Sequence, residues 1–168
     1  MSVFSSLNQE AGLFLSLNND ILRIAQSLDS VPEIKKLLYY REDNPLDQEE
    51  VKVSLVDKTI WRVPLVPLHN ETDKDTSYIT ISLLMEDLSQ GRNQAFTTVA
   101  VDIWCPPEQW VINGGLRPLL IAHHVDKAMR LKFQQTSGVK YRLDKIINSK
   151  LSDRLVGYRL VYETILEG

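Results

Sequence analysis

The chain has 168 residues with an ordinary balance of 43% hydrophobic and 24% charged residues, enough for one domain with a buried core. Its net charge of −3 lacks the basic surplus that is typical of nucleic-acid-binding proteins. The single cysteine, Cys105, excludes an internal disulfide and fits a reducing compartment. No apolar run approaches the ~18 residues of a membrane span, and Met1–Phe4 lacks the positive charge of a signal peptide. We therefore expect a soluble, cytosolic protein without a membrane partner.

The first 41 residues are predicted to be a helical N-terminal region. Residues 6–28 carry apolar side chains at helical spacing, namely Phe14, Leu17, Ile21, Ile24 and Leu28. The polar run Asn18–Asp20 favours a break or kink in this helix. A second helix is expected at about 31–41, where Pro32 fits the first turn and Ser30 with Glu33 frames a capping box.

Residues 42–50 form an acidic connector without a basic residue. Its five acids are Glu42, Asp43, Asp47, Glu49 and Glu50. A solvated connector is the ordinary interpretation of such a run, and an acidic docking surface for a basic partner is the alternative.

From residue 51 onward the hydrophobic period changes from helix-like to two, which predicts β-strands. Val51–Leu55 alternates apolar and polar residues, and 60–66 is a second extended run that Pro64 would restrict to an edge. Tyr78–Met85 and Ala95–Ile103 each have one strongly apolar face, so they are expected to pair as an antiparallel hairpin. A sheet covered on one side follows from this pattern.

The predicted cover is a helix over about 116–133, with Leu119, Ala122, Val125 and Met129 on its apolar stripe. Beyond it, 139–143 is predicted to be a short strand and 157–166 a final strand. Residues 144–155 fit no single period, and a helix is one interpretation of them. The expected fold class is α+β, an antiparallel β-sheet covered on one face by helices, with a helical N-terminal region. We expect one domain over 1–168, with its sheet-and-helix core at 51–168.

The sequence contains no clear catalytic or metal-binding pattern, and we expect neither enzymatic activity nor a cofactor. His123 and His124 are adjacent, so on a helix they point about 100° apart and do not form an i, i+4 metal pair. Cys105 precedes two prolines and is interpreted as a structural thiol, with a nucleophile paired to His69, His123 or His124 as the alternative. Asn113–Gly115 suits a tight turn, with anion binding at the following helix as the alternative.

Two tryptophans and one arginine lie where the central strand ends and the predicted helix begins. Trp104 and Trp110 suit core or loop anchors, and they are also residues that dominate protein interfaces. Arg117 lies in the first helical turn, where a cation opposes the helix dipole. It is expected either to be solvated or to pair with an acid on a neighbouring element or subunit.

These elements resemble those of a known family. The order is a helical N-terminal region, an apolar hairpin, the strand exit Val101-Asp102-Ile103-Trp104-Cys105-Pro106, then Trp110, the helix opening Leu116-Arg117-Pro118-Leu119, and the final strand Gly157-Tyr158-Arg159-Leu160. From residue 51 onward, the chain resembles the tail-terminator and neck-connector proteins of tailed bacteriophages.

The resemblance implies a structural virion protein that forms a homohexameric ring. Such a ring caps the tail tube, stops its polymerisation and joins the tail to the head-side neck, so its partners would be the tail-tube protein and the neck or connector proteins. DNA would pass through the lumen without sequence-specific binding, and the subunits would lie in the host cytoplasm before assembly. The candidate interface comprises Trp104, Trp110 and Arg117 with loop residues Asp73, Lys74, Gln90, Arg92 and Asn93.

Three alternatives remain open at this point. The first is a head-side connector, stopper or head-completion protein, which differs from a tail terminator in its position in the virion. The second is a small hydrolase that uses Cys105 with a histidine. The third is a cytosolic adaptor domain, which would bind a host partner and not associate with virions.

Overall fold

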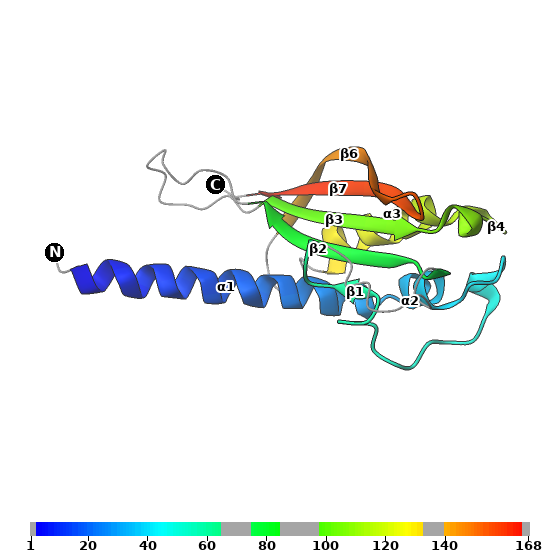
Figure 1. Ribbon diagram of the computed structural model, residues 1–168. Helices are drawn as coiled ribbons and strands as arrows, with labels where there is room; N and C mark the ends of the chain where they lie inside the picture. Colours follow the sequence, from blue (N-terminus) through cyan, green and yellow to red (C-terminus); the bar gives the residue numbers. More distant parts are fainter. Residues whose placement is uncertain (1–2, 65–74, 85–97, 133–139, 166–168) are drawn as a thin grey trace.

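The computed structural model describes residues 3–64, 75–84, 98–132 and 140–165. Its helices are α1 (Val3–Asp29), α2 (Pro32–Tyr39) and α3 (Arg117–Lys127), and a π-helical turn, η5 (Ala128–Lys132), continues α3. The strands of the main sheet are β1 (Ile60–Trp61), β2 (Tyr78–Leu84), β3 (Thr98–Cys105), β6 (Lys140–Ser152) and β7 (Leu155–Ile165). The predicted α+β class is confirmed, as Figure 1 shows.

The main sheet has the strand order β1-β2-β3-β7-β6. All of its neighbours are antiparallel except β1 and β2, which pair in parallel over two residues. The predicted hairpin of β2 and β3 is confirmed, with Ile79 opposite Ile103 and Ile81 opposite Val101. β3 lies at the centre and is buried along its whole length, because helices cover one face and side chains of the other strands cover the second.

The helices form one layer against one face of the sheet (Figure 1). Their fully buried side chains meet those of β2, β3 and β7 in one core, which includes Ile24, Leu28, Ile34, Leu37, Ile121, Val125, Ile79, Ile81, Val101, Ile103 and Tyr162. Figure 1 also shows that the N-terminal half of α1 runs beyond the edge of the sheet, and Leu15 on this part is 66% exposed.

The opposite face carries a smaller cluster of large side chains. Tyr78, Trp104 and Leu155 are buried there, and Trp61 and Leu151 pack against them. The indole Nε1 of Trp104 donates a hydrogen bond to Thr80 Oγ1 at 3.1 Å. Next to this cluster, Arg159 donates two hydrogen bonds to the fully buried carboxylate of Asp102, at 2.7 and 3.0 Å, so that buried charge is paired.

Two segments differ from what the sequence patterns indicated. Residues 51–55 alternate like a strand but lie outside the sheet, since the chain first joins it at Ile60. Residues 144–155, for which a helix was one interpretation, belong mostly to β6, the edge strand, which is exposed over much of both faces. A strand buried on neither face has no period-two burial to reveal it.

Helix details also differ from the predictions. α1 is continuous through Asn18–Asp20. The expected capping box is wrong, because Val31 is the N-cap of α2 and Ser30 Oγ donates instead to Ser27 O. The apolar stripe predicted for the helix over 116–133 is confirmed at Val125 and Met129, which are buried, but not at Leu119, which is 47% exposed. The predicted loops at 67–77 and 86–94 lie largely or wholly outside the described residues.

Gly157 allows β3 and β7 to approach closely at one point. A Cβ on Gly157 would lie 1.8 Å from the backbone oxygen of Ile103 and 2.9 Å from its carbonyl carbon. Because the obstructing atoms belong to the backbone of the central strand, no side-chain movement relieves the overlap.

The variant Gly157→Ala is therefore expected to lower the free energy of unfolding by about 3 kcal/mol or more, measured by chemical denaturation. The control is Gly114→Ala, where φ is +96° but no atom lies within 4 Å of the added Cβ. This control carries only the backbone strain of a side chain at positive φ, about 1–2 kcal/mol. Equal losses in the two variants would contradict the close-approach argument.

Candidate functional site

Arg117 is the most deeply buried cation that the structure describes, with no exposed surface. Its guanidinium donates to four backbone carbonyl oxygens: Gln109 at 3.0 Å, Leu37 at 2.7 Å, Tyr40 at 2.6 Å and Glu42 at 2.9 Å. Burial lowers the pKa of Arg117, and the nearby Asp43 and Glu42 oppose that shift. The side chain thus joins the start of α3 to the end of α2 and the beginning of the acidic connector.

This arrangement corrects the expectation for Arg117, and it agrees with the interpretation of Trp104 as a core anchor. Arg117 is neither solvated nor available to a neighbour, because the chain's own carbonyls occupy its donors. Trp104 is only 3% exposed in the cluster with Tyr78 and Leu155. Arg117 therefore acts as an interior anchor of the folded chain. Trp104 is also part of the interior, although its side chain forms part of the wall of a hollow at the β6 end of the sheet.

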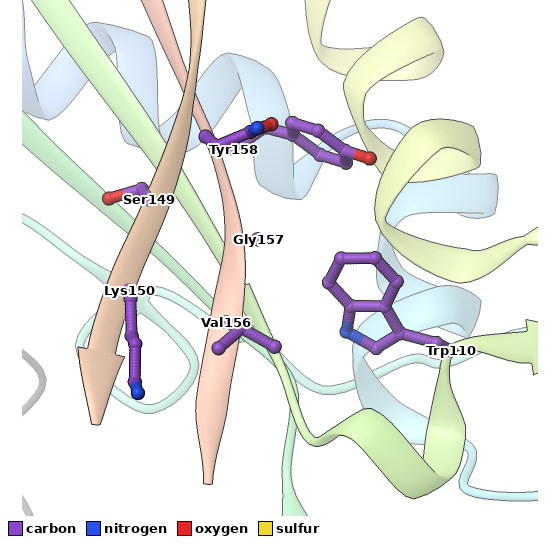
Figure 2. A pocket seen from close by; sticks show the side chains of 7 residues that line it. Trp110, Ser149, Lys150, Val156, Gly157 and Tyr158 are labelled. Carbon is purple, nitrogen blue, oxygen red and sulfur yellow. The ribbon is translucent and has the colours of Figure 1, made fainter. Parts of the chain in front are cut away.

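Trp110 is half-buried beside a hollow at the end of the sheet. Its indole Nε1 donates to Cys105 O at 3.2 Å, and its ring centroid lies 6.0 Å from that of Tyr158. The short hairpin of β4 (Val111–Ile112) and β5 (Gly115–Leu116) follows, which confirms the tight turn predicted at Asn113–Gly115. Figure 2 shows Trp110 and Tyr158 on one side of the hollow. Lys150 of β6 and Val156 of β7 also line it.

A hollow lies on each face of the sheet at the same stretch of β6. The hollow beside Trp110 has a volume of about 400 Å³, and Asn148–Lys150 form part of its wall. The second, on the opposite face, has a volume of about 320 Å³ and is lined by the same three residues together with Pro64, Trp104, Ile147, Leu151 and Arg159. Because successive side chains of a strand point to opposite faces, this short stretch borders both hollows.

β6 is the last strand in the sheet order, and no strand of the described residues pairs with its outer edge. Its register against β7 shifts between Leu143 and Lys145 and again between Lys150 and Ser152, so Lys145–Lys150 is a regular run between two irregularities. Within this run, Ile146 is 57% and Ile147 44% exposed. We call Lys145–Lys150 with its two flanking hollows the β6 edge site.

No sequence pattern described above indicated the β6 edge site. The available signal was the pair Ile146-Ile147 between Lys145 and Lys150, since neighbouring isoleucines on a strand cannot both enter one core. Among the predicted interface residues that the structure describes, Trp110 lines the hollow on one face and Trp104 lines the hollow on the other. Asp73, Lys74, Gln90, Arg92 and Asn93 lie outside the described residues.

Cys105 and the histidines do not form a catalytic pair in the described part of the chain. The Cys105 thiol is fully buried, and burial raises its pKa to about 12. His123 and His124 stack edge to face with 5.1 Å between ring centroids, and His69 lies outside the described residues. Within the described residues, no cluster of three or more His, Cys, Asp and Glu is placed to hold a metal ion. None of the described helices combines the length and apolar character of a membrane span.

One family model, described as YomW, matches the chain over residues 32–164, from the start of α2 almost to the end of β7. The match therefore includes Arg117, Trp110 and the whole β6 edge site. No curated protein and no solved structure matches the chain significantly.

The Arg117 contacts predict a large loss of stability on substitution. Arg117→Met removes the donor from the buried carbonyl of Leu37 and from the partly buried carbonyls of Tyr40, Glu42 and Gln109. The free energy of unfolding should therefore fall by about 3–5 kcal/mol. Arg142→Met is the control, since Arg142 forms an exposed ion pair with Glu163 at 3.1 Å and should change stability by less than about 0.5 kcal/mol. Urea denaturation compares the variants, and an Arg117→Met protein as stable as the control would refute the role of the contacts.

Burial of Cys105 predicts an unreactive thiol. Since the thiolate is the reactive form, a pKa of about 12 should slow labelling by a disulfide reagent at pH 8 about a thousandfold relative to the unfolded chain. Absorbance during labelling, with and without denaturant, measures both rates. Rapid stoichiometric labelling of the folded protein would contradict the structural interpretation of Cys105.

Proposed function

We propose that this chain, which belongs to the YomW family, a family associated with bacteriophages, is a structural protein of the phage particle. In this proposal it forms a ring at the head-proximal end of the tail tube. The ring caps the tube, stops its polymerisation and provides the surface to which the head-side neck proteins dock.

The β6 edge site is the observation that carries this proposal. An open strand edge with exposed isoleucines is a liability for a protein that works as a monomer, because it presents unpaired backbone groups and apolar side chains to other chains. A ring gives every such edge a partner. Hollows on both faces of the same stretch suit the alternating side chains of an added strand.

The Arg117 contacts support a rigid subunit. They hold the ends of α2 and α3 and the start of the connector in one arrangement. A subunit that must repeat the same contact around a ring benefits from elements fixed in this way, because little ordering is needed on association.

The charge of the chain suits a channel that DNA traverses. With 22 acidic and 19 basic residues, the net charge is −3. A lumen without a basic surface does not hold the phosphate backbone by counterion release. DNA would therefore move through the ring without sequence-specific binding.

The proposal is tested by measuring the mass of the purified protein alone and mixed with the tail-tube protein of the same phage. Native mass spectrometry should give a closed multimer, with six copies as the expected number, and electron microscopy should place it at the end of the tube. A protein that binds neither the tube protein nor the neck proteins would refute the proposal. Location inside the head-side neck would identify a connector or stopper instead.

A further inference from the structure

Residues 49–53 (Glu49-Glu50-Val51-Lys52-Val53) have the pattern of a strand but belong to no sheet in the described structure. Within the described part of the chain, their backbone groups make no hydrogen bonds to other backbone groups. Glu49, Glu50, Lys52 and Val53 are exposed, and Val53 is 50% exposed. We call residues 49–53 the unpaired segment.

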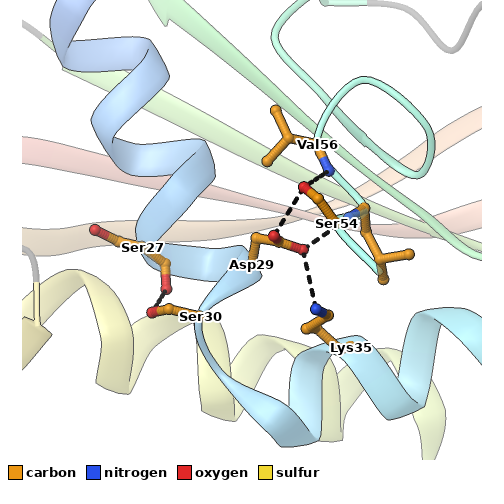
Figure 3. Close-up of polar contacts among 7 residues, drawn as sticks. Ser27, Asp29, Ser30, Lys35, Ser54 and Val56 are labelled. Carbon is orange, nitrogen blue, oxygen red and sulfur yellow. Dashed lines mark hydrogen bonds and ion pairs between the residues drawn. The ribbon is translucent and has the colours of Figure 1, made fainter. Parts of the chain in front are cut away.

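The unpaired segment is fixed where it ends. The Asp29 carboxylate, at the end of α1, accepts hydrogen bonds from Leu55 N at 2.8 Å and Ser54 Oγ at 2.9 Å. Lys35 Nζ lies 3.9 Å from the same carboxylate. Figure 3 shows Asp29 between the start of α2 and this part of the chain. The segment is thus held against the body of the protein while its own backbone stays unpaired.

The unpaired segment and the β6 edge site have opposite charge. The run Lys145–Lys150 carries two lysines and no acid, a net charge of +2. The segment begins with Glu49-Glu50, at the end of the acidic connector. Lys150 makes an ion pair with Asp153, but both side chains are exposed. Such a pair is weak, so it would compete little with an ion pair between Lys150 and an acid of another chain.

The two surfaces lie on opposite sides of the molecule. In Figure 1, β6 forms one edge of the sheet at the top of the view, and the chain between α2 and β1 runs along the bottom. In a two-fold dimer, the same surface of each subunit forms the interface. Two different surfaces on opposite sides of a subunit do not fit that arrangement. They suit a head-to-tail contact, which closes into a ring when the rotation between neighbours allows it.

We propose that the unpaired segment of one copy adds as an antiparallel strand to the β6 edge of the next copy, an inference that rests on the proposed ring. Residue spacing supports one register. Glu50 and Val53 are three residues apart, as are Lys150 and Ile147, so an antiparallel strand that places Glu50 opposite Lys150 also places Val53 opposite Ile147.

This register matches side chains on both faces of the sheet. Ile147 and Trp104 line the same hollow, and Val53 would enter it beside Ile147. Glu50 would lie on the other face with Lys150, which lines the hollow that contains Trp110. The backbone hydrogen bonds supply affinity, and the paired charge and the apolar contact set the register.

A charge exchange tests the contact. Glu50→Lys and Lys150→Glu should each raise the protein concentration at half-assembly about tenfold or more, measured by sedimentation velocity, because each creates a like-charge pair. The double variant E50K/K150E restores an opposite pair and should return to within about threefold of the unmodified protein. Lys58→Glu and Glu108→Lys change exposed charges outside both surfaces, and neither should alter assembly.

Cross-linking tests the register without relying on charge. Val53→Cys combined with Ile147→Cys should give a ladder of covalent multimers on oxidation, whereas Lys58→Cys with Ile147→Cys should not. Buried Cys105 does not compete. If the protein assembles, but the double variant does not restore assembly and the cysteine pair gives no covalent multimers, this contact is refuted while the proposed ring is not. If the unmodified protein stays monomeric at every concentration yet binds the tail tube, strand addition between copies is refuted, but the proposed location at the tail tube is not.

Discussion

The buried guanidinium of Arg117 is the constraint on which the helical layer depends. A cation without solvent needs several acceptors, and here they are backbone carbonyls from the end of α2, from the connector and from the turn before β4. The requirement fixes which face of α3 points inward, so Ile121 and Val125 reach the core while Leu119 faces outward. It also places the first residues of the connector, and with them the direction in which the chain leaves α2.

The central strands of the sheet support its open edge, β6. β3 is buried on both faces, and β7 lies against it so closely that Gly157 has room for no side chain. β7 in turn pairs with β6 along the regular run from Lys145 to Lys150. The edge that carries the exposed isoleucines is therefore supported by a rigid centre, although its own side chains lie largely outside the core.

The sequence predicted the strands whose two faces differ in composition, one strongly apolar and the other mixed. Ile79, Ile81, Val99 and Val101 alternate because only one face of their hairpin meets the helices, and that period is visible without a structure. β6 has no such period, since an edge strand exposed on both faces has no burial pattern. Arg117 was misplaced for another reason: its acceptors are carbonyls, which every residue has, so no side-chain pattern reports them.

One segment has the alternating apolar and polar residues of a strand but pairs with no strand in the monomer. Val51 and Val53 have the spacing of a strand, yet the monomer leaves them outside its sheet. The span that contains them is bounded by two hydrogen bonds, from Asn113 N to Asp43 O at 2.7 Å and from Leu55 N to Asp29 at 2.8 Å. With both ends held, this span samples fewer shapes than a free loop of equal length. Pairing it with another chain would then cost little conformational entropy.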